Sequence, residues 1–283
     1  LRIVGGLAAA RQYIRHEEPF WSKELLRLSH GKFSAEIVPF DRAGVPGQDM
    51  LRLMQLGVVP LGNLQLNRIA SQEPEFNAPD LAGLNPDMAT LKKNVGAFRP
   101  YLEKTLRERY GIELLTIYVY PAQVVFCKNP LATMADLAGR RTRVSSATGA
   151  DFVEAFGGVP VLTGFSEIMP NMATGNIECA ITGTMSGNTI GLHEVTTHLH
   201  TMTVTWGLSI FAANSAAWKG MPPELKALLQ TELPKLEAAI WSESDRETAE
   251  GIACNTGSAT CTDGRQGKMQ LVRSSPADER QRK

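Results

Sequence analysis

The sequence has no surplus charge and no long apolar run. Its 283 residues include 29 Lys and Arg and 29 Asp and Glu, so the formal net charge is zero. Without a positive excess, binding to nucleic acid or to an anionic membrane would need a local basic patch, and we expect neither partner. No apolar run approaches the roughly 18 residues of a spanning helix, so we expect no direct insertion into a membrane.

Short motifs of common enzymes are also missing. The string GTMSG has Met at the nucleophile position of a G-x-S-x-G elbow, and neither a P-loop nor a G-x-G-x-x-G fingerprint occurs. His193, His198 and His200 lie close together in the sequence, but no H-E-x-x-H motif accompanies them. We interpret these histidines as packing or surface residues. We therefore expect no catalytic residues, no metal and no cofactor, and we favour binding over catalysis.

The chain begins with LRIVGG, which has neither an initiator Met nor the apolar core of a signal peptide. We interpret this stretch as a first strand. We expect that a targeting segment has been removed, so its absence does not argue against secretion.

The four cysteines form two groups. Cys254 and Cys261 frame a loop of six polar or small residues, which burial alone cannot hold in place. A disulfide would close this loop in an oxidising compartment, and a pair of free thiols is the alternative. Cys127 and Cys179 lie in apolar, strand-like runs. There we expect buried free thiols, with a cross-strand bridge as the alternative.

Strand and helix patterns alternate along the chain, which predicts parallel sheets covered by helices. We predict an α/β fold of two lobes, each a mostly parallel sheet flanked by helices. Strands near 115–123 and 203–212 would cross between the lobes. A long helical stretch over 222–251 would brace the hinge, and Pro234 would either kink it or open the second of two helices.

The expected boundaries follow from this alternation. Residues 1–121 form the first part of lobe I, and residues 122–208 form lobe II. Residues 209–283 return to lobe I and contribute the long hinge helix and a C-terminal segment closed by the predicted Cys254–Cys261 disulfide.

Two segments in the middle of the chain carry a family resemblance. DLAGRRTRV and, after it, FSEIMPNMATGNIECA resemble the patterns D-L-x-G-x-x-x-R-V and F-S-E-V-x-x-A-L-x-x-G-x-V-D-G of a solute-binding protein family. This family serves the tripartite ATP-independent periplasmic (TRAP) transporters. The resemblance covers roughly residues 1–250. It implies a periplasmic binding protein of the two-lobed, type II-like kind, with the membrane subunits of a TRAP transporter as partner.

The resemblance implies that an arginine on a strand forms a salt bridge with a ligand carboxylate in a cleft between the lobes, and Arg143 is the matching position. A guanidinium offers a planar fork that binds a carboxylate through two parallel hydrogen bonds. From the residues alone, the alternative is a structural ion pair with Asp151 or Glu154 on the following helix.

Further ligand contacts are implied by matching positions. Phe165 matches an aromatic residue that lines the cleft, and Thr182 stands where relatives often have asparagine. Gln123 stands where some relatives have a second arginine, and Gln65 falls at a cleft position of the other lobe. Aromatic and hydroxyl side chains complete the candidate set: Tyr13, Tyr118, Tyr120, Thr184, Ser186 and Trp206.

Glutamine at 123 and threonine at 182 argue against a ligand that is held by several charges. We expect a compact monocarboxylate, such as a 2-hydroxy, 2-oxo or aromatic acid. The predicted function is extracytoplasmic capture of this small organic acid and its delivery to a TRAP transporter, without chemistry on the ligand. The alternatives are a ligand-sensing module of a signalling receptor and a small-molecule enzyme on an α/β scaffold.

Overall fold

The structure is a computed structural model that describes residues 1–70 and 72–282. The chain forms two compact units, each assembled from three stretches of sequence. Unit 1 comprises residues 1–76, 95–119 and 208–243, and unit 2 comprises residues 77–94, 120–207 and 244–282.

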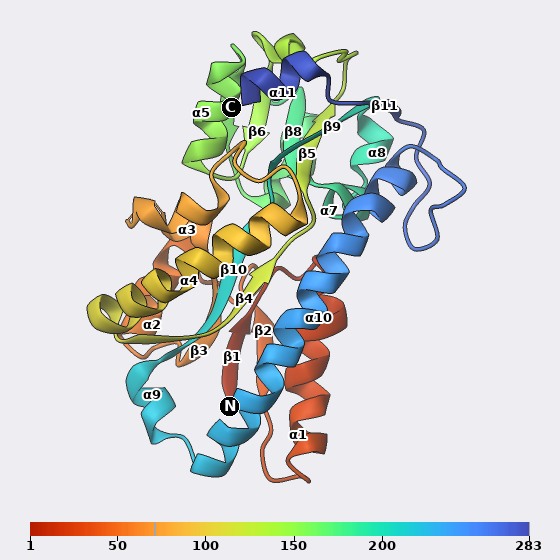
Figure 1. Ribbon diagram of the computed structural model, residues 1–283. Coiled ribbons are helices and arrows are strands. Elements are labelled where there is room, and N and C mark those ends of the chain that lie inside the picture. Colours follow the sequence, from red (N-terminus) through yellow and green to blue (C-terminus); the bar gives the residue numbers. More distant parts are fainter. Residues whose placement is uncertain (71, 283) are drawn as a thin grey trace. The chain divides into compact units, whose positions relative to one another are not determined.

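Unit 1 is built on a five-stranded sheet, which consists of β1 (Arg2–Gly5), β2 (Glu36–Pro39), β3 (Leu61–Gln65), β4 (Ile112–Val119) and β10 (Leu208–Asn214). The strand order is β2-β1-β3-β10-β4, as can be followed in Figure 1. β1 pairs in parallel with β2 and β3, whereas β10 runs antiparallel to β3 and β4. One strand therefore opposes the other four, and the sheet is mostly parallel.

The helical segments of unit 1 are η1 (Gln12–Glu17), η2 (Phe20–Glu24), α1 (Leu25–Leu28), η3 (Gly47–Asp49), α2 (Met50–Gln55), α3 (Leu66–Ile69) and α9 (Ser215–Gly220). The segment η4 (Pro74–Asp80) begins in unit 1 and ends in unit 2. An apolar core joins the sheet to η2 and α1. In this core the rings of Trp21 and Phe211 lie 5.0 Å apart, and Leu229 of a long C-terminal helix packs in the same cluster.

Unit 2 is built on a six-stranded sheet, which consists of β5 (Gln123–Cys127), β6 (Arg141–Val144), β7 (Val159–Leu162), β8 (Cys179–Gly183), β9 (His198–Thr205) and β11 (Gln270–Val272). The order is β11-β9-β5-β8-β6-β7. Only β5 opposes the common direction: it is antiparallel to β8 and β9, while β6 is parallel to β7 and β8 and β11 is parallel to β9.

Helices cover both faces of the unit 2 sheet; they are η5 (Met134–Leu137), α5 (Ala147–Ala155), η6 (Phe165–Glu167), α6 (Ile168–Ala173), α7 (Thr184–Thr189), α8 (Leu192–Val195) and α11 (Pro276–Arg282). Successive residues of β5 enter different cores, because strand side chains alternate between the two faces. Val125 packs in one apolar cluster with Phe152, whereas Phe126 packs in the other with Ile168.

Two long helices each begin in one unit and end in the other: α4 (Met88–Tyr110) and α10 (Pro223–Asn255). The 33 residues of α10 form one continuous helix that contains Pro234. The single-helix prediction is therefore confirmed, and the helix extends four residues beyond the predicted end at residue 251.

Residues 77–94 and 244–282 belong to unit 2, although the sequence analysis assigned them to lobe I. Long-range pairing explains the difference. Gly83 donates a backbone hydrogen bond of 2.7 Å to the carbonyl of Val204, and β11 extends the unit 2 sheet beside β9. The expected crossing strands near 115–123 and 203–212 are each two strands. The chain passes from one unit to the other between β4 and β5 and again between β9 and β10.

Both pairs of cysteines are disulfides. The Cys254–Cys261 bridge is confirmed. The expectation of free thiols at Cys127 and Cys179 is wrong, because these residues are also bridged. β5 and β8 pair so that the two cysteines stand directly opposite each other across the ladder.

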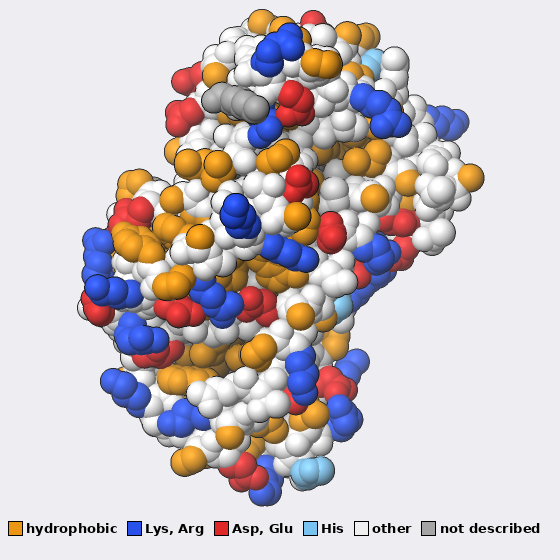
Figure 2. Space-filling view, in the orientation of Figure 1, with side chains coloured by type: hydrophobic (Ala, Val, Ile, Leu, Met, Phe, Trp, Pro, Cys, Tyr) orange, Lys and Arg blue, Asp and Glu red, His pale blue; other side chains and the backbone are white. Residues whose placement is uncertain are grey.

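Figure 2 shows Lys and Arg side chains intermixed with Asp and Glu over the visible face, as a net charge of zero would suggest. Among the helices of residues 1–70 and 72–282, none combines the length and the apolar character that crossing a bilayer requires.

Candidate functional site

Arg143 lies on β6 in unit 2 with only 3% of its surface exposed. Its Nε and Nη2 atoms donate to the carbonyl oxygen of Thr163 at 3.1 and 3.0 Å, and Nη1 donates to the carbonyl of Ile181 at 2.8 Å. Thr163 follows β7, and Ile181 is on β8. Carbonyl oxygens carry no formal charge, so these three bonds orient the guanidinium fork without neutralising it.

The two carboxylates of the alternative ion pair, Asp151 and Glu154, are exposed on α5, whereas Arg143 is buried on the strand. Ser146 directly precedes α5, and its hydroxyl accepts a hydrogen bond of 3.0 Å from the backbone N–H of Gly149. This arrangement is an ordinary helix N-cap.

Two predicted ligand contacts neighbour the groups that hold Arg143. Thr182 follows Ile181 on β8 and is buried, with 3% of its surface exposed. Phe165 begins η6 two residues after Thr163 and is half-buried. The sequence prediction thus selected residues that the structure brings to one region of unit 2.

A second group of predicted contacts meets at the turn between β9 and β10. The Nε2 atom of Gln123 donates to the carbonyl of Trp206 at 3.3 Å, and the backbone N–H of Tyr120 donates to the carbonyl of Gly207 at 3.1 Å. Gly207 has a φ of +84°, and a Cβ there would lie 2.7 Å from Nε2 of Gln123. Glycine therefore permits both the backbone conformation and the close approach of the glutamine.

The hydroxyl candidates after β8 differ in their surroundings. Ser186 is half-buried on α7. Thr184 is fully buried, and its hydroxyl donates to the carbonyl of Glu247 at 3.1 Å. Thr184 therefore has a structural hydrogen bond that joins α7 to α10 within unit 2.

The remaining candidates belong to unit 1. Gln65 is half-buried at the end of β3, opposite Ser209 of β10. Tyr13 is buried on η1, and a Cβ on Gly5 would lie only 2.7 Å from its ring, so this glycine lets the ring approach β1. Burial, followed by the charge of Glu17, raises the pKa of Tyr13 to about 12. Tyr118 packs in the apolar core of the unit.

Glu17 is a buried carboxyl group that the sequence analysis did not identify. It is 1% exposed, and its Oε2 atom accepts a hydrogen bond of 2.7 Å from the backbone N–H of Gly6. Burial raises the pKa of Glu17 to about 7, while the hydrogen bond from Gly6 and the nearby Asn63 amide act in the opposite direction. Within the described residues, buried side-chain atoms without a hydrogen-bond partner occur on three residues of the unit 1 sheet, Asn63, Thr116 and Ser209.

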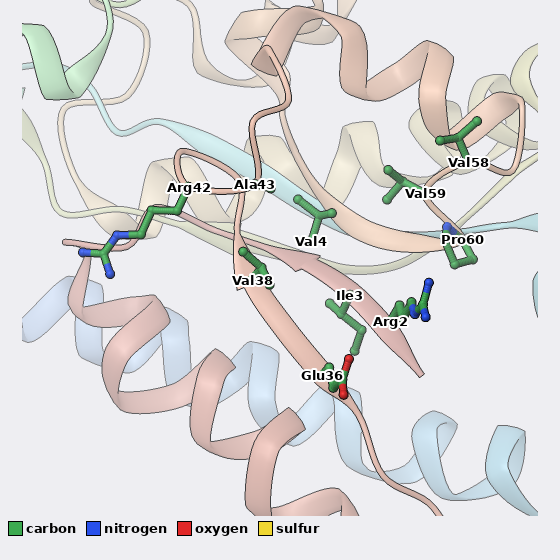
Figure 3. Close-up of a pocket in the computed structure, with 10 residues that line it drawn as sticks. All are labelled: Arg2, Ile3, Val4, Glu36, Val38, Arg42, Ala43, Val58, Val59 and Pro60. Carbon is green, nitrogen blue, oxygen red and sulfur yellow. The ribbon is translucent and has the colours of Figure 1, made fainter.

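A hollow of about 450 Å³ opens elsewhere on unit 1. Figure 3 shows its apolar floor at Val4 and Val38, with Arg42 at one end and Arg2 and Glu36 at the other. None of the predicted ligand contacts lines this hollow, so we do not assign the ligand to it.

A cluster of possible metal ligands occurs near the end of α10. One carboxylate oxygen of Glu250 and the sulfurs of Cys254 and Cys261 lie within 4.8 Å of one another. The sulfurs are joined in a disulfide, so they cannot act as thiolate ligands. The Glu250 carboxylate instead accepts backbone hydrogen bonds from Thr262 and Asp263 at 2.6 and 2.8 Å.

Asp80 is a further carboxyl group that the sequence analysis did not identify. It follows Pro79 at the end of η4, and no charged neighbour or motif in the sequence distinguishes it from a turn residue. Its carboxylate accepts hydrogen bonds from the backbone N–H groups of Trp206 and Gly207. Only the pairing of two segments far apart in the sequence reveals this position.

A family model described as "Bacterial extracellular solute-binding protein, family 7" matches residues 5–256. The chain belongs to this family. The match confirms the predicted membership of the TRAP solute-binding protein family. Members of this family are solute receptors and not enzymes.

Solved structures support the fold of this family 7 protein. One is DctP7, a Bordetella pertussis extracytoplasmic solute receptor binding pyroglutamic acid, with a TM-score of 0.88 and 20% identity over 99% of this chain and 89% of that one. A marine metagenome TRAP solute binding protein specific for pyroglutamate has a TM-score of 0.86 and 18% identity over 99% and 88%. A TRAP periplasmic solute binding protein from a Sulfitobacter species, with bound β-D-galacturonate, has a TM-score of 0.84 and 16% identity over 99% and 91%. The predicted α/β fold with two helix-flanked sheets is therefore confirmed.

Proposed function

We propose that this family 7 protein captures a small organic acid in the periplasm and delivers it to the membrane subunits of a TRAP transporter. Arg143 would bind the carboxylate of the acid. Phe165, Thr182, Gln123, Trp206, Tyr120 and Ser186 in unit 2, and Tyr13 and Gln65 in unit 1, remain the proposed further contacts. The protein would release the acid unchanged.

The observation that carries this proposal is the orientation of the buried guanidinium of Arg143. Two of its nitrogens share the carbonyl of Thr163, and a third binds the carbonyl of Ile181. The fork is therefore set before any ligand arrives, so little side-chain entropy remains to be lost on binding. A buried arginine with a fixed fork suits a carboxylate, because the pair forms charge-assisted, parallel hydrogen bonds.

A compact monocarboxylate is the proposed ligand. Thr182 and Gln123 are neutral, so they add no further charge for a second acid group. Two of the solved structures are described as binding pyroglutamate, whose single carboxylate sits on a small ring, which supports this class. The galacturonate-bound structure has the same fold, so the fold alone does not select the acid.

Calorimetric titration with a panel of acids tests the proposal. The panel is L-pyroglutamate, L-lactate, 2-oxobutanoate, benzoate, L-malate and D-galacturonate. We expect a monocarboxylate to bind most tightly, and its uncharged primary amide not to bind. Arg143→Ala should weaken binding by about 2–5 kcal/mol, the cost of removing one partner of a buried charge pair. This cost corresponds to about 30-fold to several-thousand-fold in Kd. Arg143→Lys should lose much of the affinity, because the planar fork is gone.

Arg141→Ala is the matched control. Arg141 lies two residues before Arg143 on β6, but it is exposed and donates to the carbonyls of Gly175 and Asn176. Its removal also takes away one positive charge, yet it should leave the affinity within about twofold. Equal affinity for the acid and its amide, or near-normal binding by both Arg143 variants, would contradict the proposed role of the guanidinium.

A further inference from the structure

The carboxylate of Asp80 binds two consecutive backbone N–H groups. Trp206 N donates to Oδ1 at 3.1 Å and to Oδ2 at 3.2 Å, and Gly207 N donates to Oδ2 at 2.7 Å. Hydrogen bonds to an ionised acceptor are about twice as strong as those between neutral groups. Asp80 therefore holds the Trp206–Gly207 turn from the end of η4, more than 120 residues earlier in the sequence.

The segment that follows Asp80 also binds the side chain of Trp206. The indole Nε1 donates to the carbonyl of Asn85 at 3.0 Å. Asn85 is 1% exposed, and its amide donates to the carbonyl of Pro79 at 2.9 Å, while Asn94 donates to its side-chain oxygen at 2.7 Å. Both the backbone and the ring of Trp206 are thus positioned by residues 79–94.

The Trp206–Gly207 turn also positions two other proposed ligand contacts. The carbonyl of Trp206 accepts the hydrogen bond from Gln123, and the carbonyl of Gly207 accepts the one from Tyr120. A shift of the turn would therefore displace Trp206, Gln123 and Tyr120 together, and Asp80 is the charged group that fixes the turn.

We propose that Asp80 is a positioning residue for ligand binding, whose ionised carboxylate holds Trp206 and Gln123 in the arrangement that receives the acid. This inference rests on the proposed function, in which both residues are ligand contacts. Protonation of Asp80 would replace charge-assisted bonds with weaker neutral ones and loosen the turn. The affinity for the acid would then fall as the pH is lowered.

The pH at which this loosening occurs follows from the surroundings of Asp80. Burial is the main influence and raises its pKa to about 7, while hydrogen bonds from Gly207, Trp206 and Asn85 act in the opposite direction. No charged side chain of the described residues contributes to the shift. A ligand carboxyl group with an ordinary pKa stays ionised above pH 5, so its own titration falls outside this range.

Calorimetry between pH 6 and pH 8.5 tests the inference, with the tightest-binding acid of the panel above as the probe. For the wild-type protein we expect Kd to rise by up to about tenfold from pH 8 to pH 6, the limit for one proton taken up below a pKa of about 7. Asp80→Asn should bind about tenfold more weakly than wild type at pH 8, and its Kd should not change with pH. Circular dichroism at each pH establishes that the compared proteins are folded.

Asp136→Asn is the matched control. Asp136 also accepts backbone N–H groups in unit 2, from Ala132 and Thr133 at 2.7 and 2.9 Å, but it contacts no proposed ligand residue. This variant should keep the wild-type affinity and pH profile.

Two results would overturn the inference. One is a wild-type Kd that does not change with pH, a result that does not depend on the folding of any variant. The other is a folded Asp80→Asn protein whose Kd changes with pH as much as that of the wild type. If one of these results is found but the Arg143 variants lose binding, the inference about Asp80 is wrong and the proposed function stands. If the wild-type protein binds no acid of the panel at any pH, the proposed function fails and the inference falls with it.

Discussion

Replacing Glu17 with glutamine should make the stability of unit 1 less dependent on pH. The carboxyl group is 1% exposed and receives a hydrogen bond from Gly6, but burial still raises its pKa from 4.5 to about 7. Between these two values the folded protein keeps a proton that the unfolded chain releases. Stability therefore falls as the pH rises from 4.5 to about 7, and it stays low above that range.

The size of the effect follows from the two pKa values. A rise from 4.5 to about 7 corresponds to about 3 kcal/mol of lost stability once the group is ionised in both states. Part of this loss has already occurred at pH 5. Between pH 5 and pH 8 we expect Glu17→Gln to gain about 2–3 kcal/mol relative to wild type, because glutamine is neutral throughout.

Urea denaturation at both pH values, with the disulfides kept intact, measures this difference. Tryptophan fluorescence is a suitable signal, because Trp21, Trp218 and Trp241 all belong to unit 1. Glu24→Gln is the control: Glu24 is exposed on η2, and its hydrogen bond from Arg27 lowers its pKa, so any change should be small and of opposite sign. Parallel pH profiles for wild type and Glu17→Gln would refute the reasoning.

Two further predictions concern packing and covalent bonds in unit 2. Gly251→Ala should lower the stability by about 1–3 kcal/mol, measured by thermal unfolding, because a Cβ would lie 2.3 Å from Met185 N and 2.4 Å from Thr184 C; an unchanged or higher Tm would contradict this close approach. Replacing Cys127 and Cys179 together with alanine should lower the free energy of unfolding by about 4 kcal/mol, because the bridge closes a separation of 52 residues. Alkylation of the unfolded wild-type protein without reductant should label no cysteine.

Local patterns predicted much of the fold. Helical periodicity identified α10 on both sides of Pro234, and the helix continues through the proline. The alternation of strands and helices predicted mostly parallel sheets, since each sheet has one reversed strand, β10 or β5.

Features that depend on pairing between distant segments could not be predicted. The Cys127–Cys179 bridge requires the register of β5 and β8, and apolar strand residues do not specify which strand lies opposite. Residues 77–94 resemble an ordinary loop and helix start, and only their hydrogen bonds to β9 and the following turn place them in unit 2. Asp80 was missed for the same reason.

The candidate site was predicted in part. Arg143 was identified from its strand context and the family resemblance, and the structure shows it buried and oriented by three hydrogen bonds to two backbone carbonyls. Its exact neighbours were not predictable, because Thr163 acts through a main-chain oxygen, which any residue type could supply.

The sulfur atoms of Cys127 and Cys179 are sealed inside the unit 2 sheet, where both residues have no exposed surface. An oxidising enzyme or small oxidant cannot reach thiols in that position once the helices have packed over the strands. The bond therefore has to form during folding, while β5 and β8 are still accessible. Once formed, it keeps the two strands from slipping by a residue, so oxidation acts as a step in assembly that the mature receptor cannot repeat.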